Sequence, residues 1–105
     1  MGTPGTLKNM KVDNNFFYGT TATVDIKNTA DSSVSNNLFY NIGIGGISGD
    51  DGSCIVASNN INLTVIGNRS YHDVYNKKYK ILSAGNGEGL VAKDNIYKGL
   101  DKITK

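Results

Sequence analysis

Apolar and polar residues alternate along much of this chain in short runs, which is the periodicity of β-strands. The run from Ala22 to Asn28 places Val24 and Ile26 on one side and Asp25 and Lys27 on the other. Similar runs extend from Met10 to Phe17, from Val34 to Tyr40, from Cys54 to Ala57 and from Leu90 to Tyr97. Because successive side chains of a strand point to opposite faces, these runs predict strands with one buried and one wet side.

Clusters of Asn, Asp, Gly and Ser separate these runs and predict tight turns. They cover residues 28–33, 48–53 and 83–89, and the polar segment Tyr71–Lys80 predicts a protruding loop. Residues 42–47 contain three isoleucines separated by glycines and predict one more short strand. The pattern therefore favours many short strands joined by corners, and it argues against long helices.

The strand pattern repeats along the chain. Residues 23–40 fall on residues 54–71 after a shift of 31, a shift of 27 brings residues 82–97 to nearly the same columns, and residues 12–18 match residues 34–40 after a shift of 22. A unit of this size cannot bury an apolar face alone, whereas stacked units bury a continuous core. The repeats predict an all-β parallel β-helix, a solenoid of about three to four coils.

Asparagine recurs at two fixed positions of the repeat. One column contains Asn28, Asn59 and Asn86, and the other contains Asn37, Asn68 and Asn95. Stacked coils lie ~4.8 Å apart, so the amides of one column can hydrogen-bond from coil to coil. Asn also tolerates the left-handed backbone that a corner requires. Both columns are therefore expected to form structural amide ladders.

A leucine-rich repeat is the main alternative to a β-helix. The segment Leu63–Asn68 fits the core of that repeat. No other unit fits, and no helical period follows each strand. The β-helix is the preferred interpretation.

Aromatic residues also fall into columns, with Phe16, Phe39 and Tyr97 in one and Phe17, Tyr40 and Tyr71 in the next. One set is expected to stack in the core, which is the commoner use of aromatic residues. Outward tyrosines would offer sugar rings an apolar platform with a hydroxyl at its edge. Tyr71, together with Tyr75 and Tyr79 in the polar loop, is the candidate carbohydrate-binding set.

Length and charge limit the classes of protein that fit. The 105 residues make one domain, with residues 1–9 as a flexible lead-in or expression remnant, 10–98 as coils and 99–105 as a tail or cap. A net charge of +2 gives no reason to expect nucleic-acid or membrane binding. The single Cys54 forms no intrachain disulfide and is expected as a small buried thiol. No apolar run reaches the ~20 residues of a membrane span, and no signal peptide is apparent.

Short Val/Ile strands that end in Asn-Asn or Gly-Asn before an aromatic residue, over residues 10–98, resemble the right-handed parallel β-helix of the pectin-lyase-like superfamily. The abundance of Asn, Gly, Ser and Thr makes the chain most similar to bacteriophage tailspikes and appendages. The resemblance implies a homotrimer in a virion tail or outside the cell that binds or cleaves cell-surface polysaccharide. No cofactor and no metal are expected.

A narrower resemblance suggests an enzyme. The segment Gly49–Ala57 is similar to the Gly-Asp-Asp-Cys-Ile-Ala segment of polygalacturonases, in which paired aspartates hydrolyse a glycosidic bond. It implies Asp50, Asp51 and His72 as catalytic candidates. Two residues intervene before Cys54, and no glycines flank His72. The bland alternatives are that Asp50 and Asp51 make a turn and that His72 is a loop histidine.

The preferred hypothesis is a structural and polysaccharide-binding module, and a polysaccharide hydrolase or lyase is the alternative. Three to four coils are too few to line a long substrate groove alone. They also leave strand edges that need a cap or a partner, so a homo-oligomer is expected.

Overall fold

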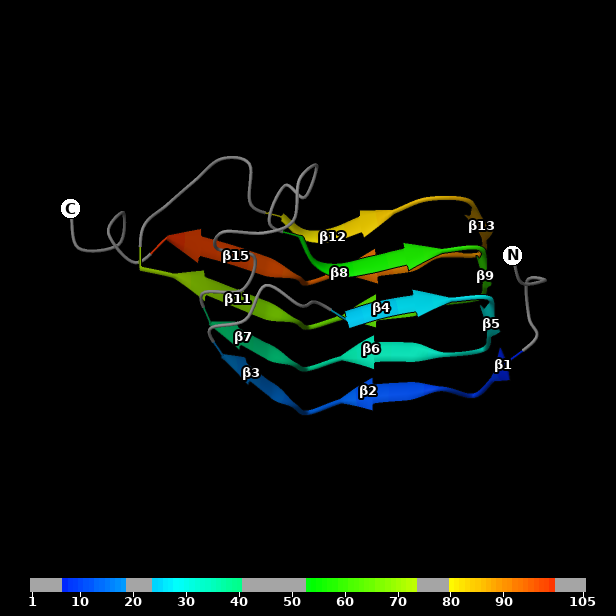
Figure 1. Cartoon of the computed structure of the whole chain (residues 1–105), viewed down its shortest axis with the longest axis horizontal. Coiled ribbons are helices and arrows are strands. Elements are labelled where there is room, and N and C mark those ends of the chain that lie inside the picture. The colour runs from blue at the N-terminus through cyan, green and yellow to red at the C-terminus, as the bar shows by residue number, and fades with distance from the viewer. Residues whose placement is uncertain (1–6, 19–23, 41–52, 74–79, 100–105) are drawn as a thin grey trace.

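The computed structural model describes residues 7–18, 24–40, 53–73 and 80–99, and all the regular structure in them is β-strand (Figure 1). No helix occurs in these segments, so they lack the helical half of a leucine-rich repeat. The strands are β1 (Leu7–Lys8), β2 (Lys11–Asp13), β3 (Phe16–Tyr18), β4 (Val24–Lys27), β5 (Thr29–Ala30), β6 (Ser33–Ser35), β7 (Leu38–Tyr40), β8 (Ser53–Ser58), β9 (Asn60–Ile61), β10 (Thr64–Ile66), β11 (Arg69–His72), β12 (Lys80–Ala84), β13 (Gly87–Glu88), β14 (Val91–Lys93) and β15 (Ile96–Gly99).

The strands form four sheets in which all neighbouring strands are parallel. Sheet A contains β1, β5, β9 and β13; sheet B contains β2, β6, β10 and β14; sheet C contains β3, β7, β11 and β15; sheet D contains β4, β8 and β12. From β4 onward the chain visits sheets D, A, B and C in that order and then returns to D (Figure 1). The prediction of an all-β chain with parallel strands is confirmed.

The predicted repeat register is also confirmed. In sheet B, Val12 pairs with Val34, Val34 with Val65 and Val65 with Ala92. These pairs reproduce the sequence spacings of 22, 31 and 27. We call each progression of the chain through the sheets a pass. Like residues therefore lie beside one another in successive passes.

Each complete pass keeps one length from sheet D to sheet C. Val24, Ile55 and Leu82 stand in one column of sheet D, and Tyr40, Tyr71 and Lys98 stand in one column of sheet C. The sequence distance between the two columns is 16 residues in every pass. The passes consequently differ in length only where the chain returns from sheet C to sheet D.

Residues with left-handed backbone form the corners between sheets. Asn9, Asp31, Asn62 and Gly89 lie between sheets A and B, and Asn14, Asn36, Gly67 and Asp94 lie between sheets B and C, with φ from 55° to 72°. Asn28 and Asn59 adopt the same conformation between sheets D and A, with φ of 60° and 61°. Gly, Asn and Asp pay the lowest steric cost in this region. The many Asn, Asp and Gly residues of the chain therefore fit the left-handed positions at its corners.

These corners divide strands that the alternation predicted as continuous. Residues 10–17 contain β2 and the start of β3, residues 34–40 contain most of β6 and all of β7, and residues 90–97 contain β14 and the start of β15. The predicted turns over residues 28–33 and 83–89 likewise contain β5 and β13. The boundaries were wrong because one left-handed residue is enough to turn the chain, and no proline or glycine cluster marks it.

Other boundaries also need correction. Tyr71 and His72 belong to β11 and Lys80 begins β12, so both ends of the predicted loop are strand. Strand structure begins at Leu7, inside the predicted lead-in, and continues to Gly99. Residues 42–47 and 48–52, with their predicted strand and turn, lie outside the described residues.

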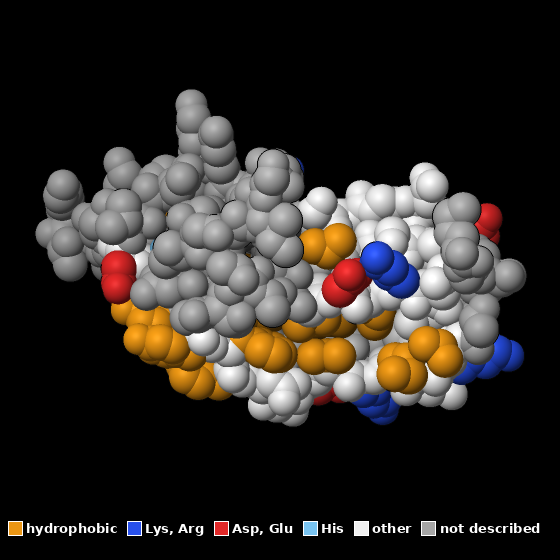
Figure 2. All heavy atoms as spheres, viewed as in Figure 1, with side chains coloured by type: hydrophobic (Ala, Val, Ile, Leu, Met, Phe, Trp, Pro, Cys, Tyr) orange, Lys and Arg blue, Asp and Glu red, His pale blue; other side chains and the backbone are white. Residues whose placement is uncertain are grey.

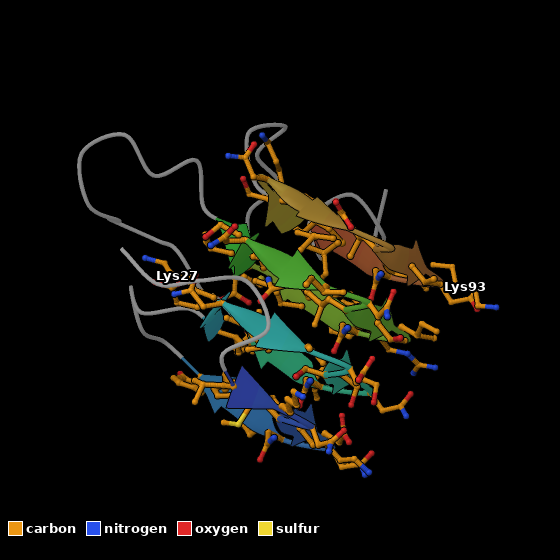
Figure 3. The ribbon with its side chains drawn as sticks, turned by 90° about the vertical axis from the view of Figure 1, so that its right-hand side faces the viewer. Lys27 and Lys93 are labelled. Carbon is orange, nitrogen blue, oxygen red and sulfur yellow. The ribbon has the colours of Figure 1, made fainter. Side chains whose placement is uncertain are left out.

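The core is one cluster of apolar side chains from sheets B, C and D. Ile26, Val34, Phe39, Ile55 and Val65 are each at most 6% exposed. Figure 3 shows Lys27 of β4 and Lys93 of β14 projecting to opposite sides, away from this interior. Complete burial of one such side chain contributes about 1.5–3 kcal/mol. Among the residues that the structure describes, the best-buried ones all belong to the two middle passes.

The aromatic columns differ from the prediction by one position. Phe17 pairs with Phe39, and Ser70 pairs with both Phe39 and Tyr97, so these four residues share a column. The rings of Phe17 and Phe39 stack with centroids 5.0 Å apart and planes 12° apart. Phe16 pairs with Leu38 instead. The set that contains Phe17 and Phe39 is therefore the inward column.

Cys54 is fully buried, as expected for a small core thiol. Its Sγ donates a hydrogen bond of 3.1 Å to Ser70 Oγ across the interior. This contact joins β8 of sheet D to β11 of sheet C.

Candidate functional site

The outer face of sheet C carries two columns of large side chains. Phe39 and Ser70 of the inward column are 1% and 0% exposed, so their neighbours along each strand face outward. One outward column contains Phe16, Leu38, Arg69 and Ile96, and the next contains Tyr18, Tyr40, Tyr71 and Lys98. Hydrophobic side chains gather at the lower left of the surface, over the β3 and β7 region (Figure 2).

Aromatic rings lie close together at the start of these columns. The centroids of Tyr18 and Tyr40 are 5.5 Å apart with planes 53° apart, and Phe16 meets Tyr18 edge to face at 6.4 Å. Phe16 and Tyr18 are 60% and 66% exposed. The Tyr40 hydroxyl donates a hydrogen bond to Asp73 Oδ1, which fixes that ring from the following pass. The result is an exposed aromatic platform on a rigid sheet.

A hollow of about 340 Å³ adjoins the platform. It is lined by Asn36, Asn37, Leu38, Gly67, Arg69 and Tyr71. Arg69 is exposed, and its guanidinium offers donors in a fork that suits carboxylate or hydroxyl oxygens. We define the binding face as this hollow together with the two outward columns of sheet C.

His72 lies on the other side of β11 from Tyr71. It is fully buried, and its ring meets Tyr97 edge to face with centroids 5.1 Å apart. The expectation of a loop histidine is wrong, because the strand extends further than the polar sequence around it suggested. An imidazole in the interior cannot share an outer groove with a bound polysaccharide. Asp50 and Asp51, its proposed catalytic partners, lie outside the described residues.

Asn37, Asn68 and Asn95 form a ladder inside the fold, and Asn15 extends it. The backbone N–H and Nδ2 of Asn37 both donate to Asn68 Oδ1, at 3.1 and 2.9 Å. The same two groups of Asn68 donate to Asn95 Oδ1, at 3.0 and 2.9 Å, and those of Asn15 donate to Asn37 Oδ1, at 2.9 and 3.2 Å. Every step therefore runs from a donor in one pass to an acceptor in the next.

The column of Asn28, Asn59 and Asn86 is built differently. Asn59 Nδ2 donates to Asn28 Oδ1 at 2.7 Å. Asn86 takes part through its backbone carbonyl, which accepts from the Asn59 N–H, while its side chain is exposed. Side-chain amides thus connect only two passes at this corner of the described structure.

Sequence reasoning missed another buried amide, Asn60. Its Oδ1 accepts from the N–H and Oγ1 of Thr29, at 3.0 and 2.9 Å, and its Nδ2 donates to the Ile26 carbonyl at 3.0 Å. The sequence signal for this buried amide was the Asn-Asn dipeptide. Asn59-Asn60 and Asn36-Asn37 both place a left-handed corner residue before an inward amide.

Reasoning from sequence also missed Phe16, Tyr18 and Arg69 as parts of an outward face. Their position relative to the ladder was the available signal, because Phe16 and Tyr18 follow Asn15 by one and three residues and Arg69 follows Asn68 directly. Of the predicted carbohydrate-binding residues, Tyr71 lies on the binding face, partly exposed. Tyr75 and Tyr79 lie outside the described residues.

Two further features of the described segments concern other kinds of site. They contain no group of three or more His, Cys, Asp or Glu side chains placed to hold a metal ion. None of their elements is a helix long and apolar enough to cross a membrane.

Comparison with protein-family models, with curated proteins and with solved structures found no match.

Proposed function

We propose that the chain is part of a right-handed parallel β-helix and acts as a structural and receptor-binding module, similar to a phage tailspike, that contacts cell-surface polysaccharide. Four parallel sheets visited in one repeating order support the fold. A virion tail or the outside of the cell is the location that accords with this function, and association of the chain with copies of itself accords with it as well.

The observation that carries the binding proposal is the column of Tyr18, Tyr40 and Tyr71 on the outer face of sheet C. A strand spacing of ~4.8 Å brings successive rings to about the length of one pyranose unit. Tyrosine supplies an apolar face for a sugar ring and a hydroxyl for its polar edge. A polysaccharide chain running across the strands would therefore meet one ring in each of three passes. Arg69 and Lys98 add hydrogen-bond donors further along the same face.

The direct test is binding of purified envelope polysaccharides to the chain and to two variants, Tyr18→Ala and Tyr71→Ala. Each variant should raise the Kd about three- to tenfold, on the scale of a lost aromatic contact. Val91→Ala is the matched control, because Val91 is also exposed but belongs to sheet B. Unchanged affinity in both tyrosine variants would remove the binding face from the proposal.

The hydrolase or lyase alternative needs a separate test. Incubation with the same polysaccharides should release no reducing ends and form no unsaturated sugar. The burial of His72 weighs against its direct contact with a substrate. Turnover that is lost in Asp51→Asn, with folding intact, would reinstate the enzyme hypothesis.

A further inference from the structure

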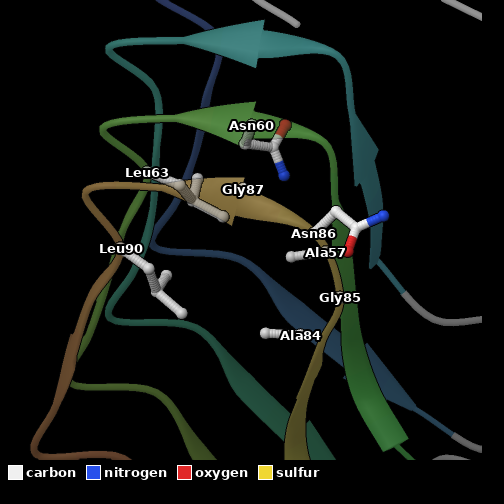
Figure 4. Close-up of a pocket in the computed structure, with 8 residues that line it drawn as sticks. All are labelled: Ala57, Asn60, Leu63, Ala84, Gly85, Asn86, Gly87 and Leu90. Carbon is white, nitrogen blue, oxygen red and sulfur yellow. The ribbon is translucent and has the colours of Figure 1, made fainter.

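The same inward columns that are buried in the middle passes are open at both ends of the described stack. Leu63 is 2% exposed, whereas Leu90, its neighbour in the last pass, is 43% exposed. Met10 occupies this column in the first pass and is 44% exposed. Figure 4 shows Leu63 and Leu90 pointing toward Ala57 and Ala84 across a hollow of about 140 Å³. The last pass thus leaves part of the apolar interior uncovered.

The two ends are complementary in their hydrogen-bonding groups. At the last pass, the Asn95 N–H has no acceptor among the described residues, and its Nδ2 donates to the Val65 carbonyl at 2.8 Å. At the first pass, Asn15 is exposed and its Oδ1 accepts from none of the described residues. The ladder therefore presents donors at one end and an acceptor at the other. Within the fold, this same pairing of groups joins each pass to the next.

The backbone edges match a partner in the same orientation. All strands of sheets A, B and C run in parallel, so a second copy that stacks in the same direction continues these sheets with the strand pairing found within the fold. In that arrangement Met10 of one copy would meet Leu90 of the other, Val12 would meet Ala92 and Phe17 would meet Tyr97. Apolar residues face apolar or aromatic residues at all three positions.

We propose that a second copy of this chain docks head to tail, with its first pass on the last pass of its neighbour, through an Asn95-to-Asn15 hydrogen bond and the Leu90–Met10 column. The interface joins two different surfaces and does not close by itself, so it generates linear stacks. It would cover the open apolar columns and satisfy the exposed strand edges together.

The test measures molar mass against concentration by sedimentation velocity. The unaltered chain should form multiples of 11.2 kDa that grow with concentration. Leu90→Glu blocks one end and Met10→Glu blocks the other, and each variant alone should remain monomeric. Val91→Glu is the matched control, because Val91 is 48% exposed but faces outward beside Leu90, and it should still associate.

Mixing the two blocked variants separates head-to-tail docking from other modes. Each variant retains one intact end, so an equimolar mixture should form a dimer of about twice 11.2 kDa and no longer species. This recovery also shows that neither variant is misfolded, which circular dichroism checks independently. A monomer at every concentration, a mass that Leu90→Glu leaves unchanged, or no dimer in the mixture would overturn the proposal. A trimer of constant mass would overturn it as well.

Discussion

Asn68 Oδ1 accepts two hydrogen bonds from Asn37, one from the backbone N–H and one from Nδ2. Asn68 Nδ2 in turn donates to the Val34 carbonyl at 2.9 Å and to Asn95 Oδ1. A single side chain thus satisfies polar groups in the passes before and after its own. Because Asn68 is fully buried, no solvent can replace these partners.

Asn68→Ala should therefore destabilise the fold by about 3 kcal/mol, since a buried polar group left unpaired costs about 1–3 kcal/mol and several are orphaned. Urea unfolding followed by circular dichroism measures the change. Asn86→Ala is the matched control, because that side chain is exposed, and its free energy of unfolding should change by less than about 0.5 kcal/mol. Equal losses in the two variants would contradict the ladder as a source of stability.

Gly67→Ala should be costly because of its backbone conformation. Gly67 has a φ of 72°, whereas the contact of an added Cβ with Asn36 Oδ1, at 2.5 Å, can be relieved by movement of the exposed Asn36 side chain. The left-handed conformation alone costs a residue with a Cβ about 1–2 kcal/mol. Gly85→Ala provides the comparison, because the nearest atom to its added Cβ is 3.6 Å away. We expect a lower thermal midpoint for Gly67→Ala only, and a similar drop for Gly85→Ala would refute the corner explanation.

Leu63→Ala and Leu90→Ala test the depth of the core within one column. Leu63 is buried by passes on both sides, so its truncation should cost about 2–5 kcal/mol. Leu90 is exposed at the last pass, and the same truncation should cost well under half as much when measured at concentrations where the chain is monomeric. Chemical denaturation of both variants measures the two losses in the free energy of unfolding. Similar losses would show that the last pass is as well covered as the third.

Cys54 should react with an aromatic disulfide reagent only when the fold opens. The thiol is fully buried and donates to Ser70, so direct attack by a reagent is blocked. Labelling should be slow in buffer and complete within the mixing time in concentrated urea. The rate in buffer should rise in Asn68→Ala, because a less stable fold opens more often. Immediate labelling of the native chain would be inconsistent with this burial.

The columns of the fold could be predicted from the sequence because the pattern of residues around Val12 recurs without gaps around Val34 and Val65. The corners could not, since a lone Asn36 turns the chain as completely as a glycine-rich loop would. The periodicity of Val34 to Tyr40 therefore reads as one strand where the fold has two.

The candidate site was harder to predict than the fold. Tyr71 was identified from its column, but Tyr18 was assigned to no site because the aromatic register had been placed one residue off. His72 was misjudged since polar neighbours suggested a loop, whereas strand pairing with Gly99 carries it into the interior. Pairing with a distant strand leaves no trace in the local sequence around a residue.

The constant distance from Val24 to Tyr40, Ile55 to Tyr71 and Leu82 to Lys98 has a practical consequence for protein engineering. Within this chain, the repeats differ in length at a single kind of junction, the one that follows sheet C. We expect foreign peptides inserted at that junction to leave the amide register of every pass unchanged, whereas insertions at the other three kinds of junction would shift it.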